Sequence, residues 1–226
     1  MRLPKITKYV TTKEKENIEI PSLDLDRKFY NLGREKEKFK YISTIEKLCR
    51  SSLEYKDLIS YLKNTMGMDF CSFFHKVSKK NFGKTRIRIE IHHEPFTLYD
   101  ITAIVLNKRL EEDESIDMYD ICDEVMRLHY EGCVGLLPLS TTAHELVHSG
   151  KLFIPLQFID EGFNKFYNDY KLTIRSMDGL CDMLEAKVQL SKEFQKNPDE
   201  FLSILQKKYI YVVNENFNNI EYLKKQ

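Results

Sequence analysis

The sequence predicts an α+β protein in which a small sheet is embedded in a mostly helical chain. Three observations support this class. Most of the chain repeats its apolar residues every three to four positions, as amphipathic helices do. Residues 86–92 instead alternate charged residues with isoleucines, which is the period of a strand. A short apolar segment, 132–139, reads as a second strand and leads directly into a capped helix.

The predicted elements divide the chain into four regions. These are an extended polar arm (1–40), an N-terminal helix plus strand (41–84), a core with a helical insertion (85–170) and a C-terminal helical region (171–226). The arm is rich in Lys and Glu and holds a short helix near Arg34–Lys40. We expect protein partners to dock through this arm or through the C-terminal helices.

The N-terminal half is expected to hold one long helical stretch followed by two strands. Apolar residues at helical spacing predict a helix over 41–66 with a break at Ser51–Ser52. Gly67 follows as a C-cap. The aromatic-rich segment 69–77 reads as a strand, and a turn leads from it to the alternating strand that ends at His92.

The C-terminal half is expected to be helical on both sides of the second strand. Apolar spacing predicts helices over 97–110, 116–130, 172–196 and 198–209. A shorter helix should follow the strand, beginning at the N-capping run Ser140–Thr142 and ending at Gly150.

Composition excludes several classes of protein. Lys plus Arg and Asp plus Glu both total 35, so net charge gives no indication of nucleic-acid binding. A local basic run, 76–88, fits either a solvated strand face or phosphate contact. No long apolar run or export signal is visible, so we expect a cytoplasmic protein without a membrane span. None of the five cysteines forms a C-x-x-C pair, which predicts free thiols in the core.

The most informative motif places His144 and His148 four residues apart on the short helix. Four residues is about one helical turn, so both rings project from one face and can share a cation. A second pair, His92–His93, ends the alternating strand. Neighbours on a strand point to opposite faces, so both can serve one site only if the strand ends or bends there, as Pro95 favours.

The segments Ile89–Pro95 and Leu137–Gly150 together resemble the HNH, or ββα-metal, nuclease family, and in particular the HNH-type proteins of tailed bacteriophages. The resemblance implies a ββα-metal (HNH) core within 85–170. It further implies that His92, His144 and His148 bind one divalent metal ion, which could be Zn, Mn, Ni or Mg. Three protein ligands leave a position open for a scissile phosphate.

The resemblance also implies the reaction and its partner. His93 would be the general base of a metal-dependent endonuclease that hydrolyses the phosphodiesters of double-stranded DNA, in the cytoplasm of a phage host. Five residues of the basic run are candidate contacts to the DNA backbone: Lys79, Lys80, Lys84, Arg86 and Arg88.

One feature of the HNH pattern is missing. The family usually carries an Asn that braces the catalytic loop, and Gly135 stands at that position. The Gly135 carbonyl or His129 would then have to orient His93.

Two other functions stay open. In a zinc metallopeptidase of the H-E-x-x-H type, Glu145 would be the base and Glu161 the third ligand beside His144 and His148. In a catalytically inactive structural or DNA-binding protein, the metal would only staple the fold.

Overall fold

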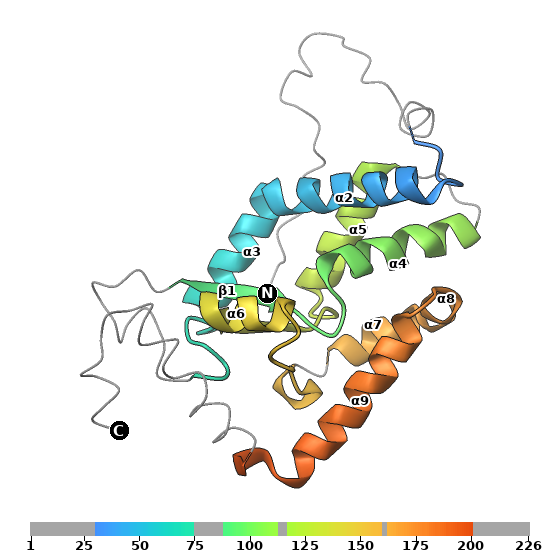
Figure 1. Cartoon of the computed structure of the whole chain (residues 1–226). Coiled ribbons are helices and arrows are strands. Elements are labelled where there is room, and N and C mark those ends of the chain that lie inside the picture. Colours follow the sequence, from blue (N-terminus) through green and yellow to red (C-terminus); the bar gives the residue numbers. More distant parts are fainter. Residues whose placement is uncertain (1–29, 75–87, 113–116, 160–161, 201–226) are drawn as a thin grey trace. The chain divides into compact units, whose positions relative to one another are not determined.

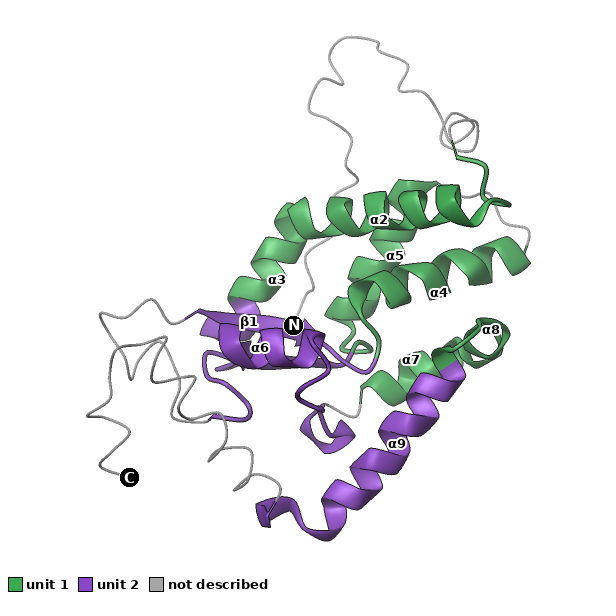
Figure 2. Cartoon of the chain, in the orientation of Figure 1, with its two compact units in different colours: residues 1–60, 96–134, 161–180 green, residues 61–95, 135–160, 181–226 purple. Residues whose placement is uncertain are grey.

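The computed structural model describes residues 30–74, 88–112, 117–159 and 162–200 (Figure 1). The chain divides into two compact units that interleave along the sequence (Figure 2). Unit 1 comprises residues 1–60, 96–134 and 161–180, and unit 2 comprises 61–95, 135–160 and 181–226. The described part is helix-rich with a two-stranded antiparallel sheet, which confirms the predicted α+β class.

Unit 1 is a packed set of helices. Its elements are α2 (Glu35–Ser51), the first part of α3 (Leu53–Asn64), α4 (Leu98–Glu111), α5 (Met118–Tyr130), α7 (Phe163–Asp169) and α8 (Lys171–Ser176). Helices α2, α4 and α5 contact one another. Their facing sides bury apolar residues, including Ile45, Ile104, Leu106, Ile121 and Val125. This burial is the main stabilising term of the unit.

Local sequence signals set the ends of these helices. Thr97 caps α4 through a reciprocal capping box, in which its Oγ1 accepts from the Asp100 N–H at 3.1 Å and the Asp100 carboxylate accepts from the Thr97 N–H at 2.9 Å. Ser52 separates α2 from α3. Its hydroxyl donates to the Cys49 carbonyl at 2.7 Å and accepts from the Tyr55 N–H at 2.9 Å, which confirms the predicted break.

Four of the five cysteines that the sequence assigned to the core lie there, whereas Cys181 is only half-buried. Cys49, Cys71, Cys122 and Cys133 are buried free thiols, as predicted. Cys49 on α2 and Cys122 on α5 meet in unit 1, with their Sγ atoms 2.9 Å apart. The hydrogen bond with the Cys122 sulfur, together with burial, raises the pKa of the Cys49 thiol well above its usual value, so it stays protonated.

Unit 2 contains the sheet. Strand β1 (Ile89–His93) pairs antiparallel with β2 (Leu136–Ser140), so that Ile89 lies opposite Ser140 and His93 opposite Leu136. Helix α6 (Thr141–His148) follows β2 without a linker, because Ser140 both ends the strand and caps the helix. The helix ends before Gly150, whose φ of 68° suits glycine.

The rest of unit 2 covers this sheet and helix. The apolar residues of its core include Phe73, Leu137, Leu139, Ala143 and Leu152. The 3-10 turn η1 (Leu156–Phe158) and the long helix α9 (Leu180–Lys196) complete the described part of the unit. Among the helices that the structure describes, none is long and apolar enough to cross a membrane.

Two sequence predictions need correction. The described part of 69–77, residues 69–74, forms no continuous strand: the Ser72 N–H and hydroxyl both donate to the Pro138 carbonyl, and Pro138 has no N–H to return a bond. The predicted helix over 172–196 is two helices, α8 and α9. They are separated at Met177–Gly179, where Gly179 adopts a φ of 79°.

Candidate metal centre

Three histidines of unit 2 gather around one point. His92 comes from β1, and His144 and His148 come from α6. Their ligand atoms all lie within 4.8 Å of one another. The antiparallel pairing of β1 with β2 and the direct continuation of β2 into α6 bring the three residues together, since α6 then contacts β1. The predicted ligand set is therefore assembled by the fold.

The spacing of the imidazole nitrogens suits a shared metal ion. The Nε2 atoms of His144 and His148 are 3.1 Å apart. Two nitrogens bound to one tetrahedral Zn²⁺ lie about 3.3 Å apart, given Zn–N bonds of ~2.0–2.1 Å. The His92 ring stands 5.0 Å from the His144 ring and 5.3 Å from the His148 ring, centroid to centroid. Small side-chain rotations would complete a three-nitrogen site.

Glu90 orients one of these rings. Its Oε2 lies 2.8 Å from His144 Nδ1, which leaves His144 Nε2 for a metal. Metal-binding histidines commonly donate their second N–H to a carboxylate in this way, which fixes the tautomer and strengthens the ligand. Arg88 contacts the other oxygen, with its Nε 3.1 Å from Glu90 Oε1. The alternation of the strand already places Glu90 on the face of His92, a signal that the sequence interpretation did not use.

A second carboxylate, that of Glu94, lies beside His92. Its Oε2 is 3.5 Å from His92 Nε2, and its Oε1 forms an ion pair with Lys187 of α9. The Glu94 side chain is only 4% exposed, so both of its oxygens depend on protein partners. Sequence reasoning missed both Glu94 and Lys187. Lys187 gave no usable signal, because its place depends on how α9 packs.

The cluster has one accessible side. His92 is buried, His144 is half-buried and His148 is exposed. Solvent therefore reaches the cluster at His148, the last residue of α6. An accessible group of three histidines can bind a metal ion and leave a coordination position open.

His93, the predicted base, is the last residue of β1 and is buried. It is not one of the three residues of the cluster. The chain leaves the strand directly after it, and the following Glu94–Pro95 peptide bond is cis. His93 thus directly follows the cluster residue His92 along the chain, and it ends the strand at the point where the sequence predicted a strand end or bend.

The surroundings of Gly135 leave no room for a side chain. A Cβ added there would lie 1.9 Å from the Glu94 carbonyl oxygen and 2.5 Å from a methyl group of Ile159. No side chain fits without a shift of the backbone. The Gly135 carbonyl instead accepts a hydrogen bond from the Glu94 N–H at 3.0 Å. This contact braces the chain directly after His93 through the backbone.

The remaining predicted residues fall into two groups. Among the described ones, Arg88 is largely exposed beside Glu90, and Glu145 is exposed on α6. His129 is buried in α5 of unit 1 with its Nδ1 2.7 Å from the Val125 carbonyl, and burial lowers its pKa to about 4. The others lie outside the described residues: Lys79, Lys80, Lys84, Arg86 and Glu161.

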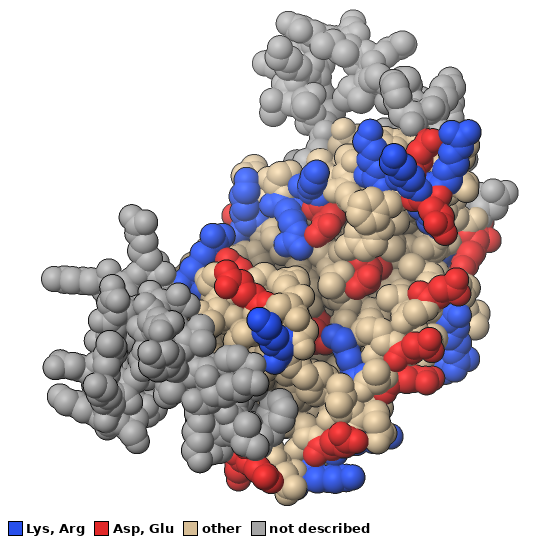
Figure 3. All heavy atoms as spheres, in the orientation of Figure 1, with Lys and Arg blue, Asp and Glu red and all other residues tan. Residues whose placement is uncertain are grey.

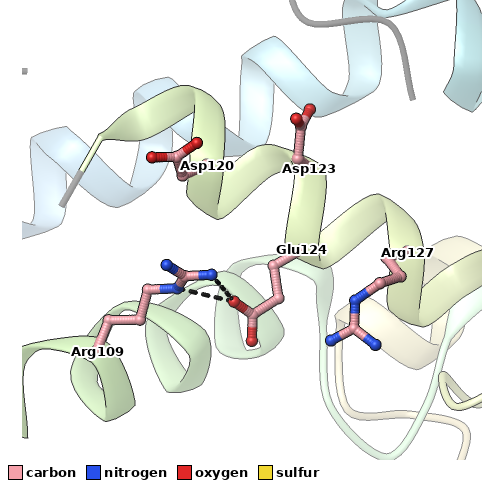
Figure 4. Close-up of a pocket in the computed structure, with 5 residues that line it drawn as sticks. All are labelled: Arg109, Asp120, Asp123, Glu124 and Arg127. Carbon is pink, nitrogen blue, oxygen red and sulfur yellow. Dashed lines mark hydrogen bonds and ion pairs between the residues drawn. The ribbon is translucent and has the colours of Figure 1, made fainter. Parts of the chain in front are cut away.

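A hollow in unit 1 has a different character (Figure 4). It is lined by Arg109, Asp120, Asp123, Glu124 and Arg127. Arg109 Nε donates to Glu124 at 2.8 Å, and the Tyr170 hydroxyl donates to the same carboxylate. Burial and this bond raise the pKa of Tyr170. Among the described residues, none of those predicted for the metal centre lines the hollow, which we interpret as an ion-pair network joining α4 and α5.

The described charged side chains on the face drawn in Figure 3 give little support for DNA contact. On the face drawn in Figure 3, the described Lys and Arg side chains are interspersed with Asp and Glu. This agrees with the zero net charge of the chain. The predicted backbone contacts therefore depend on the run 76–88, of which Arg88 is the described member.

The comparisons with known proteins give one match. Residues 2–220 match the family model of the bacteriophage G278-like virion protein. The chain belongs to this family. The match confirms the predicted bacteriophage origin, and its description names a virion protein without naming an activity. No curated protein and no solved structure matches the chain.

Proposed function

We propose that this member of the G278-like family binds one divalent transition-metal ion through His92, His144 and His148 and hydrolyses DNA phosphodiesters with it. The supporting observation is the set of three imidazoles, held by β1 and α6 within 4.8 Å and accessible from one side. The order of strand, strand and helix in unit 2 is the order expected for a ββα-metal (HNH) core.

The donor set narrows the choice of metal. Imidazole nitrogens suit Zn²⁺ or Ni²⁺, whereas Mg²⁺ and Mn²⁺ are better suited by oxygen ligands. We therefore expect Zn²⁺ or Ni²⁺ to bind more tightly than Mn²⁺ or Mg²⁺. When bound, the ion would stabilise the negative charge that develops on the phosphate.

The residues of the chain would carry the other tasks. His93 would accept the proton of the attacking water, a role for which imidazole is suited near neutral pH. Glu90 would keep His144 in the ligating tautomer through its bond to Nδ1. Arg88, exposed beside Glu90, would contact the DNA backbone together with Lys79, Lys80, Lys84 and Arg86.

A plasmid-cleavage assay tests this proposal. Wild type, His93→Ala and Glu145→Ala would be assayed with Zn²⁺, Ni²⁺, Mn²⁺ and Mg²⁺, with metal content measured on the same samples. We expect cleavage by wild type and Glu145→Ala and loss of cleavage in His93→Ala. Wild-type protein that holds one metal ion per chain and cleaves no DNA would contradict the nuclease proposal.

The second candidate is a virion component in which the metal only stabilises the fold. The family description and the bracing of Gly135 by backbone contact, in place of the usual Asn, favour it. In that case the protein would lie in the phage particle. It would bind other proteins there through residues 1–40 or through its C-terminal helices. Metal removal would destabilise unit 2 without any activity being lost.

The metallopeptidase alternative has less support. It needs Glu161 as third ligand, and His92 already supplies a third imidazole next to His144 and His148. A peptide-hydrolysis assay on the same samples tests it: the activity should be lost in Glu145→Ala and kept in His93→Ala.

A further inference from the structure

The ion pair between Glu94 and Lys187 lies at the edge of the histidine cluster. One oxygen of the Glu94 carboxylate, Oε1, pairs with Lys187 Nζ, and the other, Oε2, lies 3.5 Å from His92 Nε2. The carboxylate is almost fully buried, while the lysine comes from the middle of α9. Helix α9 thus reaches the candidate site.

The position of Glu94 makes it a potential fourth ligand. Two atoms bound to one metal ion lie about 3 Å apart, and the gap between Glu94 Oε2 and His92 Nε2 is only slightly larger. A buried carboxylate is strongly attracted to a divalent cation, because little water is present to screen the two charges. The glutamate needs a competing partner if the fourth position is to stay open.

We propose that Lys187 is this partner, and that it holds Glu94 away from the metal so that the fourth coordination position stays free for substrate. The inference rests on the metal site proposed above. Lys187 acts as a positioning residue, because it works through Glu94. It neutralises the carboxylate, so the three imidazoles and the ion keep the full positive charge that a phosphate would meet.

Contacts between α9 and the turn η1 keep the lysine in place. The Ser191 hydroxyl accepts from the Leu156 N–H at 2.9 Å, and the Gln157 side chain donates to the Ser191 carbonyl at 3.0 Å. The Phe194 ring packs edge-on against Phe158, with centroids 5.6 Å apart. These contacts involve all three residues of η1, and on α9 they lie one to two helical turns beyond Lys187.

This proposal and a purely structural ion pair predict opposite effects of Lys187→Met. If the pair only stabilises the fold, its loss loosens the site and weakens metal binding. If Lys187 restrains Glu94, its loss leaves a buried carboxylate unpaired in the metal-free protein and lets it bind the metal in the loaded protein. The metal-free state is then destabilised relative to the loaded state, and metal affinity rises.

The test is a Zn²⁺ affinity measurement by competition with a chromophoric chelator, on the full chain. We expect Lys187→Met to bind Zn²⁺ about tenfold more tightly than wild type, the size of effect typical of residues around metal ligands. The double variant Glu94→Gln/Lys187→Met should return to the wild-type affinity for Zn²⁺, because the amide that replaces the Glu94 carboxylate is a poor metal ligand. Lys187→Arg should behave as wild type, and Lys192→Met, at an exposed lysine of α9, controls for the lost charge.

A second readout and a second Lys187 variant complete the experiment. The visible spectrum of the Co²⁺-loaded protein should change in Lys187→Met and return in the double variant, since it reports the ligands directly. Lys187→Gln is measured in parallel, so that a folding defect of one variant does not decide the result. Equal or weaker Zn²⁺ binding by both Lys187 variants would overturn this inference and leave the metal site intact. A wild-type chain that binds no metal would overturn the site itself.

Discussion

The two units use histidine in opposite ways. In unit 1, His129 is buried in a helical core and bonds through Nδ1 to the Val125 carbonyl, and burial holds its pKa near 4. In unit 2, His92, His144 and His148 meet at one point with the carboxylates of Glu90 and Glu94 beside them. The difference shows that the neighbours of a histidine, and not its burial alone, distinguish a metal centre from a core residue.

The units also differ in what stabilises them. Unit 1 relies on apolar packing between α2, α4 and α5, with the charged network of Glu124 at one side. Unit 2 has a short two-stranded sheet, which is marginal in isolation and needs packing or a metal to become stable. Metal binding should therefore stabilise unit 2 selectively.

The largest effect is expected from His144→Ala, which removes a ligand of unit 2. It should abolish the rise in melting temperature that Zn²⁺ produces in wild type, since two imidazoles bind too weakly to shift the folding equilibrium. Differential scanning fluorimetry with and without Zn²⁺ measures this. Glu145→Ala, an exposed neighbour on the same helix, serves as the control and should keep the full shift. An unchanged shift in His144→Ala would remove the metal centre from unit 2.

Gly135→Ala should be the most destabilising change of a single methyl group. The added Cβ would lie 1.9 Å from the Glu94 carbonyl oxygen, so the strand ends must separate. We expect a loss of more than about 3 kcal/mol in the free energy of unfolding. Gly150→Ala is the control, because its Cβ meets open space and costs only about 1 kcal/mol for its positive φ. Urea denaturation measures both free energies of unfolding. Equal losses in the two variants would show that the close approach of Gly135 to the Glu94 carbonyl can relax.

Acid should weaken unit 1 through His129. The unfolded chain binds a proton at the ordinary imidazole pKa of about 6.5, whereas burial lowers the folded value to about 4. The stabilisation is therefore complete above pH ~6.5 and is lost as pH falls toward 4, by up to about 3 kcal/mol. His129→Gln should flatten this part of the stability profile, measured by urea denaturation from pH 7 to 4. A variant with the wild-type profile would show that His129 protonates without cost.

The smallest effect concerns the partner of His144. Glu90→Gln should weaken Zn²⁺ binding by about 10- to 100-fold, because the amide orients Nδ1 less strongly than the carboxylate does. Competition with a chelator measures the affinity. Glu185→Gln, at an exposed carboxylate of α9, is the matched control and should bind as wild type. An affinity unchanged by Glu90→Gln would mean that the carboxylate has no part in the centre.

Sequence reasoning predicted those parts of the fold that depend on local signals. Helices α4, α5 and α6 begin at recognisable caps, and the break at Ser52 follows from its own hydroxyl. It failed over 69–74, where the aromatic pattern suits a strand but Pro138 of the neighbouring strand cannot continue the ladder. The pairing of this segment depends on Pro138, which lies 66 positions from Ser72, and the periodicity of a segment cannot reveal so distant a partner.

The candidate site shows the same division. The spacing of His144 and His148 and the position of His92 at a strand end were sufficient to predict the cluster. Glu90 was within reach of the same argument, because it shares the strand face of His92. Lys187 and the tight packing at Gly135 depend on segments far apart in the chain, so only the folded structure shows them.

The most direct test of the central claim is X-ray absorption spectroscopy at the zinc edge on the Zn²⁺-loaded full chain. We expect one zinc per chain with three imidazole nitrogens at about 2.0–2.1 Å and at least one further light ligand. His144→Ala should lose one imidazole from the fitted shell. A zinc environment with fewer than three imidazoles in wild type would contradict the assignment of His92, His144 and His148 as one metal centre.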